Sequence, residues 1–175
     1  MQVFKNIGNL LTLESAEKVK AGRHIETADL SIIKNAALIE DGGKIVWVGL
    51  ESQWGEGLKR LGASSNLVKE IDLQQRTVMP AFTECHTHLI FSGDRRDEFE
   101  LRNQGATYLE IAAQGGGILS TVSATQKASP AELFQLAQTR LNRFIKQGVT
   151  TCEVKSGYGL NHESEIKMLK VANQL

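Results

Sequence analysis

The feature that most constrains the fold is a strand–helix–strand unit in the second half of the chain. A Pro-led apolar segment, residues 80–89, is followed further along by a helix signature that begins at Ser129. Ser129 and Glu132 form a capping box around a proline at the first helical position, and an apolar strand, 149–154, follows the helix at once. Asn161 then opens a second helix. Strands that alternate with helices pair in parallel, so we expect an α/β sheet or barrel after residue 80.

The first 78 residues have a different pattern, typical of short strands without long helices. Two β-rich segments joined by Asp41-Gly42-Gly43 predict a hairpin. Residues 52–63 are polar and interrupted by glycine, which favours a loop or short helix. We expect strands at 28–33, 36–40, 44–49 and 68–73. The chain therefore divides into a β domain, 1–78, and an α/β domain, 79–175.

Composition excludes several classes of protein. The 20 basic and 20 acidic residues give zero formal charge, which argues against nucleic acid or an anionic membrane as a partner. No apolar run approaches the roughly 20 residues of a membrane span, and residues 1–6 lack the plan of a signal peptide. Two cysteines, Cys85 and Cys152, make a poor disulfide framework and indicate a reducing cytoplasm. We expect Cys85 to be a small buried apolar side chain.

His86 and His88 lie at the end of the strand expected at 80–89. Side chains two apart on a strand point to the same face, so both imidazoles should face one polar pocket. Two neutral imidazoles are half of a catalytic zinc or iron site, which usually has three protein ligands and an open position for water. The pair alone is weak evidence, because most histidine pairs in proteins are ordinary polar residues.

Four further motifs surround this pair, and two of them follow the expected strands, where the active sites of α/β barrels are built. The four are Gly-Asp-Arg (93–95), Ala-Thr-Tyr-Leu-Glu-Ile (106–111), Gly-Gly-Gly-Ile (115–118) and Lys-Ser-Gly-Tyr-Gly-Leu (155–160). With His-x-His, and in this order, they resemble the imidazolonepropionases, a family of the metal-dependent amidohydrolase superfamily. His-x-His points only to the superfamily, whereas the other four motifs are specific to the one family. The resemblance extends over essentially the whole chain.

The resemblance implies a fold, an activity and a set of site residues. The fold would be a metal-dependent hydrolase (β/α)8 barrel, preceded by a small β-sandwich-like domain assembled from both chain ends. The activity would be hydrolysis of 4-imidazolone-5-propanoate to N-formimidoyl-L-glutamate in histidine degradation. His86 and His88 would bind one zinc or iron ion, whereas Arg95, Tyr108 and Tyr158 would bind the substrate. The guanidinium of an arginine suits this task, because its planar N–H groups can donate a pair of hydrogen bonds to the substrate carboxylate.

Arg95, Tyr108 and a charged pair also have simpler interpretations. On composition alone, Arg95 is a solvated charge in an acidic and basic run, and Tyr108 fits an ordinary amphipathic helix face. Glu153 and Lys155 share one face of a strand, so they either pair with each other or belong to a polar network under the substrate; we favour the network.

Two departures from the family pattern stand out. Glu84 replaces the more usual aspartate before Cys85, and its extra methylene could shift a hydrogen bond that orients a metal ligand. The remaining metal ligands and the acid–base residues of the family would lie beyond residue 175, so no catalytic residue is assigned within the chain. We therefore expect a truncated, inactive portion of a larger enzyme, which as a whole would be a cytoplasmic homodimer. Two alternatives stay open: another amidohydrolase, such as a nucleobase deaminase or cyclic-amide hydrolase, and a non-catalytic fragment.

Overall fold

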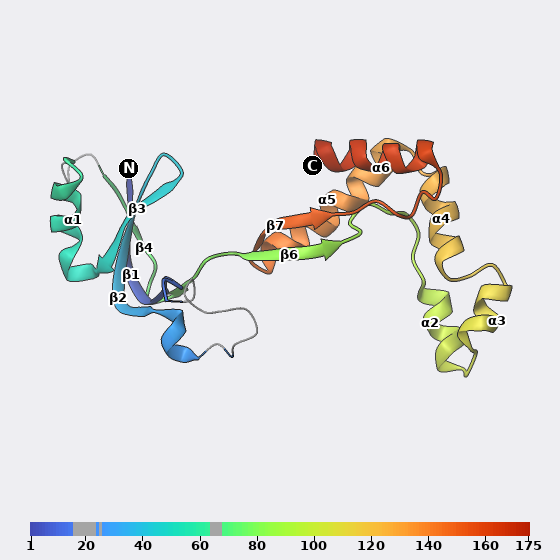
Figure 1. Ribbon diagram of the computed structural model, residues 1–175, viewed down its shortest axis with the longest axis horizontal. Coiled ribbons are helices and arrows are strands. Elements are labelled where there is room, and N and C mark those ends of the chain that lie inside the picture. Colours follow the sequence, from blue (N-terminus) through green and yellow to red (C-terminus); the bar gives the residue numbers. More distant parts are fainter. Residues whose placement is uncertain (16–23, 25, 64–67) are drawn as a thin grey trace. The chain divides into compact units, whose positions relative to one another are not determined.

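The computed structural model describes residues 1–15, 24, 26–63 and 68–175 (Figure 1). These residues form two compact units, Met1–Pro80 and Ala81–Leu175, and each unit contains a sheet of its own. The elements of the first unit are β1 (Gln2–Leu11), η2 (Thr27–Leu30), β2 (Ile32–Asp41), β3 (Lys44–Leu50), η3 (Glu51–Gln53), α1 (Trp54–Arg60), β4 (Lys69–Asp72) and β5 (Thr77–Val78).

The sheet of the first unit is built around β1. Its strand order is β3-β2-β1-β4, and β5 pairs with the far part of β1. Strands β2 and β3 are antiparallel and turn through Gly42 and Gly43, whose φ angles are +57° and +82°. Glycine adopts such angles without steric cost, and the predicted hairpin is confirmed.

Two details of this sheet differ from the prediction. The strand expected at 28–33 is found only in part. Residues 28–30 lie in the 3-10 helix η2, Ser31 has a left-handed backbone, and β2 begins at Ile32 and continues to Asp41. Strand β1 was not singled out by its sequence. Its pairing with β2 shifts register between Phe4 and Ile7, where Asn6 has a φ of +55°. This bulge breaks the alternation of apolar residues from which a strand is recognised.

The first unit buries two small apolar clusters. One joins Val3 and Ile39 of the sheet to Leu58 of α1. The other lies towards the opposite end of β1 and consists of Ile7, Leu10, Ala36 and Leu38. Because each residue in these clusters is at least nine-tenths buried, the clusters fix the sheet against α1 and the β4–β5 segment.

The second unit has a parallel two-stranded sheet and five helices. Strand β6 pairs in parallel with β7, with Phe82 opposite Val149 and Thr87 opposite Val154. The elements are β6 (Phe82–Thr87), α2 (Arg96–Asn103), α3 (Tyr108–Ala113), α4 (Ile118–Lys127), α5 (Pro130–Lys146), β7 (Val149–Val154) and α6 (His162–Gln174). The predicted order of strand, helix, strand and helix is confirmed by β6, α5, β7 and α6, and three shorter helices, α2 to α4, precede α5. These helices form the long crossover connection that a parallel pair of strands requires.

The helix ends in this unit follow their sequence signals. Helix α5 begins at Pro130, and the hydroxyl of Ser129 accepts a hydrogen bond from the backbone N–H of Glu132. Asn161 caps α6 in the same way, with its side chain accepting from the N–H of Ser164. Each cap satisfies a backbone donor that would otherwise lack a partner.

The core of the second unit lies between α5, α6 and the residues that follow β6. Leu89 and Ile90, directly after β6, pack with Leu133 and Ala137 of α5 and with Met168 and Val171 of α6. This cluster holds the residues after His88 against both helices.

Cys85 corrects the prediction, because its side chain is exposed instead of buried. Helix α5 packs on β7, and no described helix packs closely on β6.

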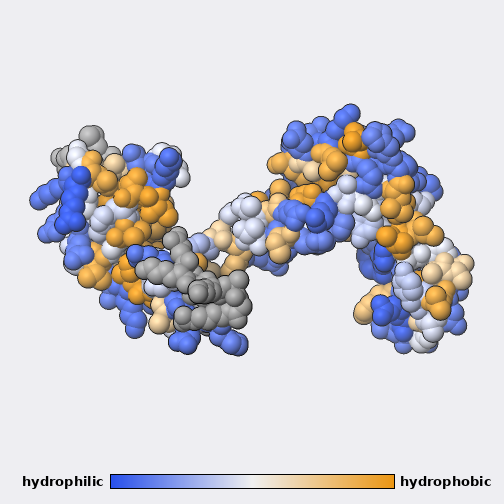
Figure 2. Space-filling model, viewed as in Figure 1, coloured by the Kyte–Doolittle hydropathy of each residue, from blue (hydrophilic) through white to orange (hydrophobic). Residues whose placement is uncertain are grey.

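Apolar residues also reach the surface of both units (Figure 2). Among them, Ile45 is 66% exposed and Phe99 is 67% exposed. Within the described ranges, no helix combines the length and apolar character needed to cross a membrane.

Candidate metal and substrate site at the end of β6

The two histidine rings lie side by side where β6 ends. Their centres are 5.5 Å apart with an angle of 71° between the ring planes. Two imidazoles that bind one metal through bonds of about 2.1 Å at a tetrahedral angle have ring centres roughly 5 Å apart. The spacing of His86 and His88 therefore fits two ligands of a single ion.

The ring of His88 is the more enclosed of the two. Gly157, with a φ of +132°, lies against it so closely that a Cβ there would come within 3.1 Å of Cε1. The Nδ1 atom of His88 is buried, and it has no hydrogen-bond partner among the described residues. Buried ring nitrogens normally have a partner, so the described residues leave the hydrogen bonding of His88 incomplete at this atom.

Tyr158 lies between His88 and Phe91, and its ring is tilted against both. Its ring centre is 5.3 Å from that of His88 and 5.7 Å from that of Phe91. The guanidinium of Arg140 lies over the Phe91 ring, 3.5 Å from its centre. Such cation–π contacts are favourable when the cation is partly desolvated. Tyr158 is thus the predicted substrate residue that the structure brings to the histidine pair.

Arg140 also fixes the backbone after His88. Its Nη1 donates to the carbonyl oxygens of Leu89 at 3.0 Å and Phe91 at 2.8 Å. Burial, with a smaller contribution from Arg143, lowers the pKa of Arg140 below its usual value, yet a guanidinium stays charged in proteins. The sequence analysis missed this residue because its partners lie about fifty positions away along the chain.

Three charged residues near His86, namely Glu84, Glu153 and Lys155, interact with each other or with the strand backbone. Glu153 and Lys155 form an ion pair at 2.5 Å, and the hydrogen bond from Lys155 lowers the pKa of Glu153. Direct pairing is thus the interpretation that holds, although the network was favoured. Glu84 accepts from the backbone N–H of His86 at 3.2 Å. Its carboxylate therefore braces the strand end instead of an imidazole.

Arg95 and Tyr108 lie in other surroundings. Arg95 immediately precedes α2, is exposed, and donates through Nε to the hydroxyl of Thr121 at 3.2 Å. Tyr108 begins α3, is 60% exposed, and lies near Gly117. No described contact joins either side chain to the histidines, and their binding of substrate stays a prediction.

The described residues supply only part of a metal site. Within them, no group of three or more His, Cys, Asp or Glu side chains is arranged to hold an ion. A cavity of about 310 Å³ is lined by His88, Phe91 and Arg140 among others, whereas His86 is exposed and does not line it. The expected polar pocket shared by both rings is therefore not formed by these residues alone.

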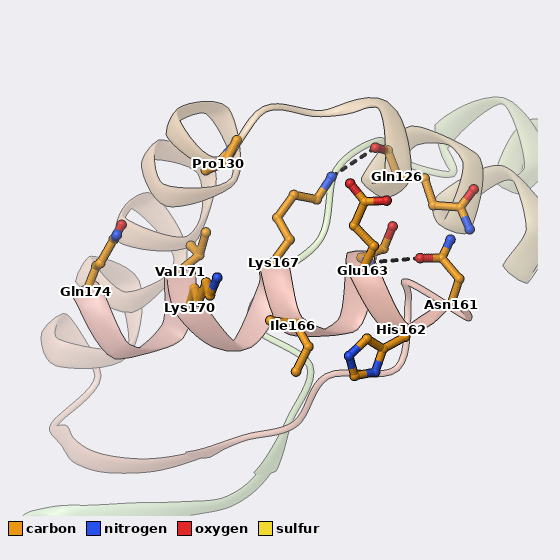
Figure 3. A pocket seen from close by; sticks show the side chains of 11 residues that line it. Gln126, Pro130, Asn161, His162, Glu163, Ile166, Lys167, Lys170, Val171 and Gln174 are labelled. Atoms are coloured by element: carbon orange, nitrogen blue, oxygen red, sulfur yellow. Dashed lines mark hydrogen bonds between the residues drawn. The ribbon is translucent and has the colours of Figure 1, made fainter.

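A second cavity, of about 910 Å³, lies elsewhere, along α6 (Figure 3). It is an open groove that none of the five predicted site residues lines. Lys167 crosses it and donates to the carbonyl oxygens of Thr125, Gln126 and Ala128 at the end of α4.

Comparison with known proteins gives a consistent result. No family model matches the chain. It is 50% identical over 173 residues to the imidazolonepropionase of Bdellovibrio bacteriovorus, which covers 99% of this chain and 40% of that protein. The imidazolonepropionase of Myxococcus xanthus is 45% identical over 175 residues, covering 99% and 39%. The chain spans about two fifths of the length of these curated relatives.

Solved structures show the same type of fold at low sequence identity. A mutant atrazine chlorohydrolase from Arthrobacter aurescens TC1, complexed with zinc and atraton, has a TM-score of 0.53 at 16% identity, covering 100% of this chain and 34% of that one. A prolidase has a TM-score of 0.52 at 16% identity, covering 89% and 26%. The E. coli guanine deaminase has 0.50 at 17%, covering 99% and 35%. These enzymes are amidohydrolases, and the likeness concerns the fold alone.

Proposed function

The chain is homologous to the N-terminal portion of imidazolonepropionases, and we propose that it is part of an enzyme with imidazolonepropionase activity. The longer protein to which this portion corresponds would hydrolyse the ring of 4-imidazolone-5-propanoate to N-formimidoyl-L-glutamate, in histidine degradation. The observation that supports this most is the pair formed by His86 and His88, whose ring centres lie 5.5 Å apart at the end of β6.

The proposal gives each unit a place in a larger fold. The second unit would be the start of a (β/α)8 barrel, with β6 and β7 as its first two strands. The first unit would be the N-terminal part of a β-sandwich-like domain. In a barrel, the ends of such strands form the active-site mouth, which is where His88 and Tyr158 lie.

His86 and His88 would hold one zinc or iron ion together with ligands from the rest of the longer protein. When bound, such an ion would lower the pKa of a water molecule and so provide the nucleophile. Tyr158, packed on His88, would orient the ring of the substrate, Arg95 would bind the propionate, and Tyr108 would also contact the substrate. These residues lower the barrier through positioning.

We also propose that the longer protein is a cytoplasmic homodimer. Both cysteines, Cys85 and Cys152, are free, which agrees with a reducing compartment. Sedimentation of the purified protein would measure the oligomeric state directly.

The first experiment uses the complete natural gene product that contains these residues. We expect it to bind one zinc or iron ion and to hydrolyse imidazolonepropanoate. His86→Asn and His88→Asn should abolish both properties. His162→Asn is the matched control, because His162 is exposed at the start of α6, away from the pair. Full metal content in both site variants would contradict the metal assignment.

The second experiment tests the carboxylate. Arg95→Lys should lower kcat/KM for the propionate substrate, because an ammonium cannot make the paired contact. The loss should correspond to roughly 2–4 kcal/mol of transition-state stabilisation. Arg96→Lys is the control, since Arg96 is exposed and pairs with Asp94 in the same loop. If the wild type hydrolysed the amide of the propionate equally well, or only a cyclic amide without a carboxylate, a different amidohydrolase would be indicated.

A further inference from the structure

Two side chains hydrogen-bond to the backbone after Tyr158 in the loop between β7 and α6, residues 155–161. Nε2 of Gln126 on α4 donates to the carbonyl oxygen of Gly159, and the carboxylate of Glu165 accepts from two backbone amides. Oε1 of Glu165 accepts from the backbone N–H of Gly159 at 2.7 Å and from that of Leu160 at 2.8 Å. Leu160 has a φ of +52°, a left-handed conformation that is uncommon for a leucine. Two hydrogen bonds to a charged acceptor stabilise this turn against its strain.

The carboxylate of Glu165 remains ionised in its half-buried position. Burial would raise its pKa, but the Ser156 hydroxyl and the N–H groups of Leu160, Gly159 and Gly157 outweigh that effect and lower the pKa. Oε2 is buried without a partner in hydrogen-bonding geometry among the described residues.

The same loop brings Tyr158 to His88. Gly159 rests directly on the first turn of α6, where a Cβ would meet the backbone N of Glu165 at 2.7 Å. Gly157, on the other side of Tyr158, lies against the His88 ring. Tyr158 thus lies between two glycines, of which Gly159 contacts the start of α6 and Gly157 contacts the His88 ring. The ring of Tyr158 is 5.3 Å from that of His88.

We propose that Glu165 is a positioning residue, which sets the place of Tyr158 beside His88 by fastening the backbone that follows the tyrosine. It does not touch substrate. The inference rests on the proposed function in one respect, namely that Tyr158 contacts the substrate, and it deepens that function by assigning a residue that controls this contact.

The test compares two acidic residues of the same helix turn in the complete gene product. Glu165→Gln keeps the shape of the side chain and removes its charge, so the loop amides keep a weaker acceptor. Glu163→Gln is the control, because Glu163 lies in the same first turn, is exposed, and lines the groove along α6 (Figure 3). Both substitutions change the helix-end charge equally, but only the first affects the loop.

Hydrogen exchange provides the structural measurement. In Glu165→Gln, the amides of Gly159 and Leu160 should exchange on the order of tenfold faster, because a charged acceptor is roughly twice as strong as a neutral one. The Glu163→Gln control should leave them unchanged. Unaltered exchange in Glu165→Gln would overturn the proposal.

Kinetics provide the functional measurement. Glu165→Gln should lower kcat/KM on the order of tenfold to a hundredfold, as misplaced contacts do. The loss should shrink in a Tyr158→Phe background, since Glu165 acts through that tyrosine. Equal losses in both backgrounds, or faster exchange with an unchanged kcat/KM, would show a purely structural residue and overturn the proposal.

A third measurement separates the inference from the proposed function. If the wild type turned over no imidazolonepropanoate, the proposed function would fail, and nitration of Tyr158 would still test the position of its ring. Tyr158 should nitrate faster in Glu165→Gln than in Glu163→Gln, with the exposed Tyr108 as internal reference. Equal nitration of Tyr158 in the two variants would contradict a positioning role.

Discussion

The loops that follow the two parallel strands are held in place by different means. The β7–α6 loop, residues 155–161, is fastened by Glu165, five and six positions from the amides that it binds. The β6–α2 loop, residues 88–95, is fastened by Arg140 and by Thr125, which lie 33 to 51 positions away from the groups they bind. The β7–α6 loop thus takes two of its hydrogen bonds from neighbouring sequence, and one from Nε2 of Gln126 on α4, which donates to the carbonyl oxygen of Gly159. The side chains that bind the backbone of the β6–α2 loop all come from the distant helices α4 and α5.

This difference affects the two predicted substrate residues. Tyr158, in the locally fastened loop, already lies against His88. Arg95 ends the other loop, where its Nε donates to Thr121 of α4. The position of Arg95 therefore depends on how α4 and α5 dock. The position of Tyr158 depends on the first turn of α6 and, through the hydrogen bond from Gln126 to Gly159, on α4 as well.

The largest effect should come from the core that both loops share. Leu133→Ala removes a fully buried side chain and should lower the free energy of unfolding by about 2–5 kcal/mol. Both loops should then exchange amide hydrogens faster, which measures the common part of their stability. Leu136→Ala, on the same helix and 39% exposed, is the control for helix propensity. A small effect of Leu133→Ala would mean that the loops do not depend on this core.

Arg140→Met should separate the two loops. It removes two charged hydrogen bonds to the backbone of residues 89 and 91, for an expected loss of about 2 kcal/mol by urea unfolding. Exchange should accelerate in the β6–α2 loop more than in the β7–α6 loop. Arg143→Met, one turn further along α5, is the matched control. Equal acceleration in both loops would remove the distinction drawn above.

Thr125→Val should act more weakly on the same loop. The Thr125 hydroxyl is fully buried and accepts from the N–H of Ser92 at 3.1 Å. Valine has the same shape but leaves that amide unpaired, so we expect a loss of about 1 kcal/mol in thermal or urea unfolding. Thr139→Val, at an exposed site on α5, should be close to neutral. A Thr125→Val variant as stable as the wild type would show that Ser92 finds another acceptor.

The smallest effect should involve neither loop and thus serves as a baseline. The backbone N–H and the hydroxyl of Ser129 donate to Glu132 and lower its pKa from the ordinary value of 4.5. The stability from this charge is therefore fully present above about that pH and is lost as the pH falls through the folded-state value. The Tm difference between wild type and Glu132→Gln should shrink towards zero in acid, as followed by circular dichroism. A difference that grows in acid would reverse the sign.

What could be predicted from sequence follows the same division between local and distant interactions. The start of α5 and the cap of α6 were predicted correctly because Ser129, Glu132 and Asn161 act within one helical turn. The hairpin was predicted because its turn needs glycines at known places. The bulged strand β1 escaped notice, since Asn6 interrupts its alternation.

The candidate site was predictable in its residue types but not in its supports. His86 and His88 were found through alternation along one strand, and Tyr158 through a motif. The role of Arg140 has no local signal, because its partners precede it by about fifty residues. Cys85 was misplaced because burial depends on which helices cover a strand, and a single segment carries no information about that.

The contact of Gly159 with α6 affects how this site could be redesigned. A side chain at this position would meet backbone atoms of Ser164 and Glu165, which cannot rotate away as a flexible side chain would. Any larger residue at 159 would require the start of α6 to move, and with it the buried Met168. Engineering of new specificity should therefore vary the side chain at position 158 and leave its glycine neighbour untouched. The backbone of the loop would then keep its conformation while the side chain at position 158 is changed.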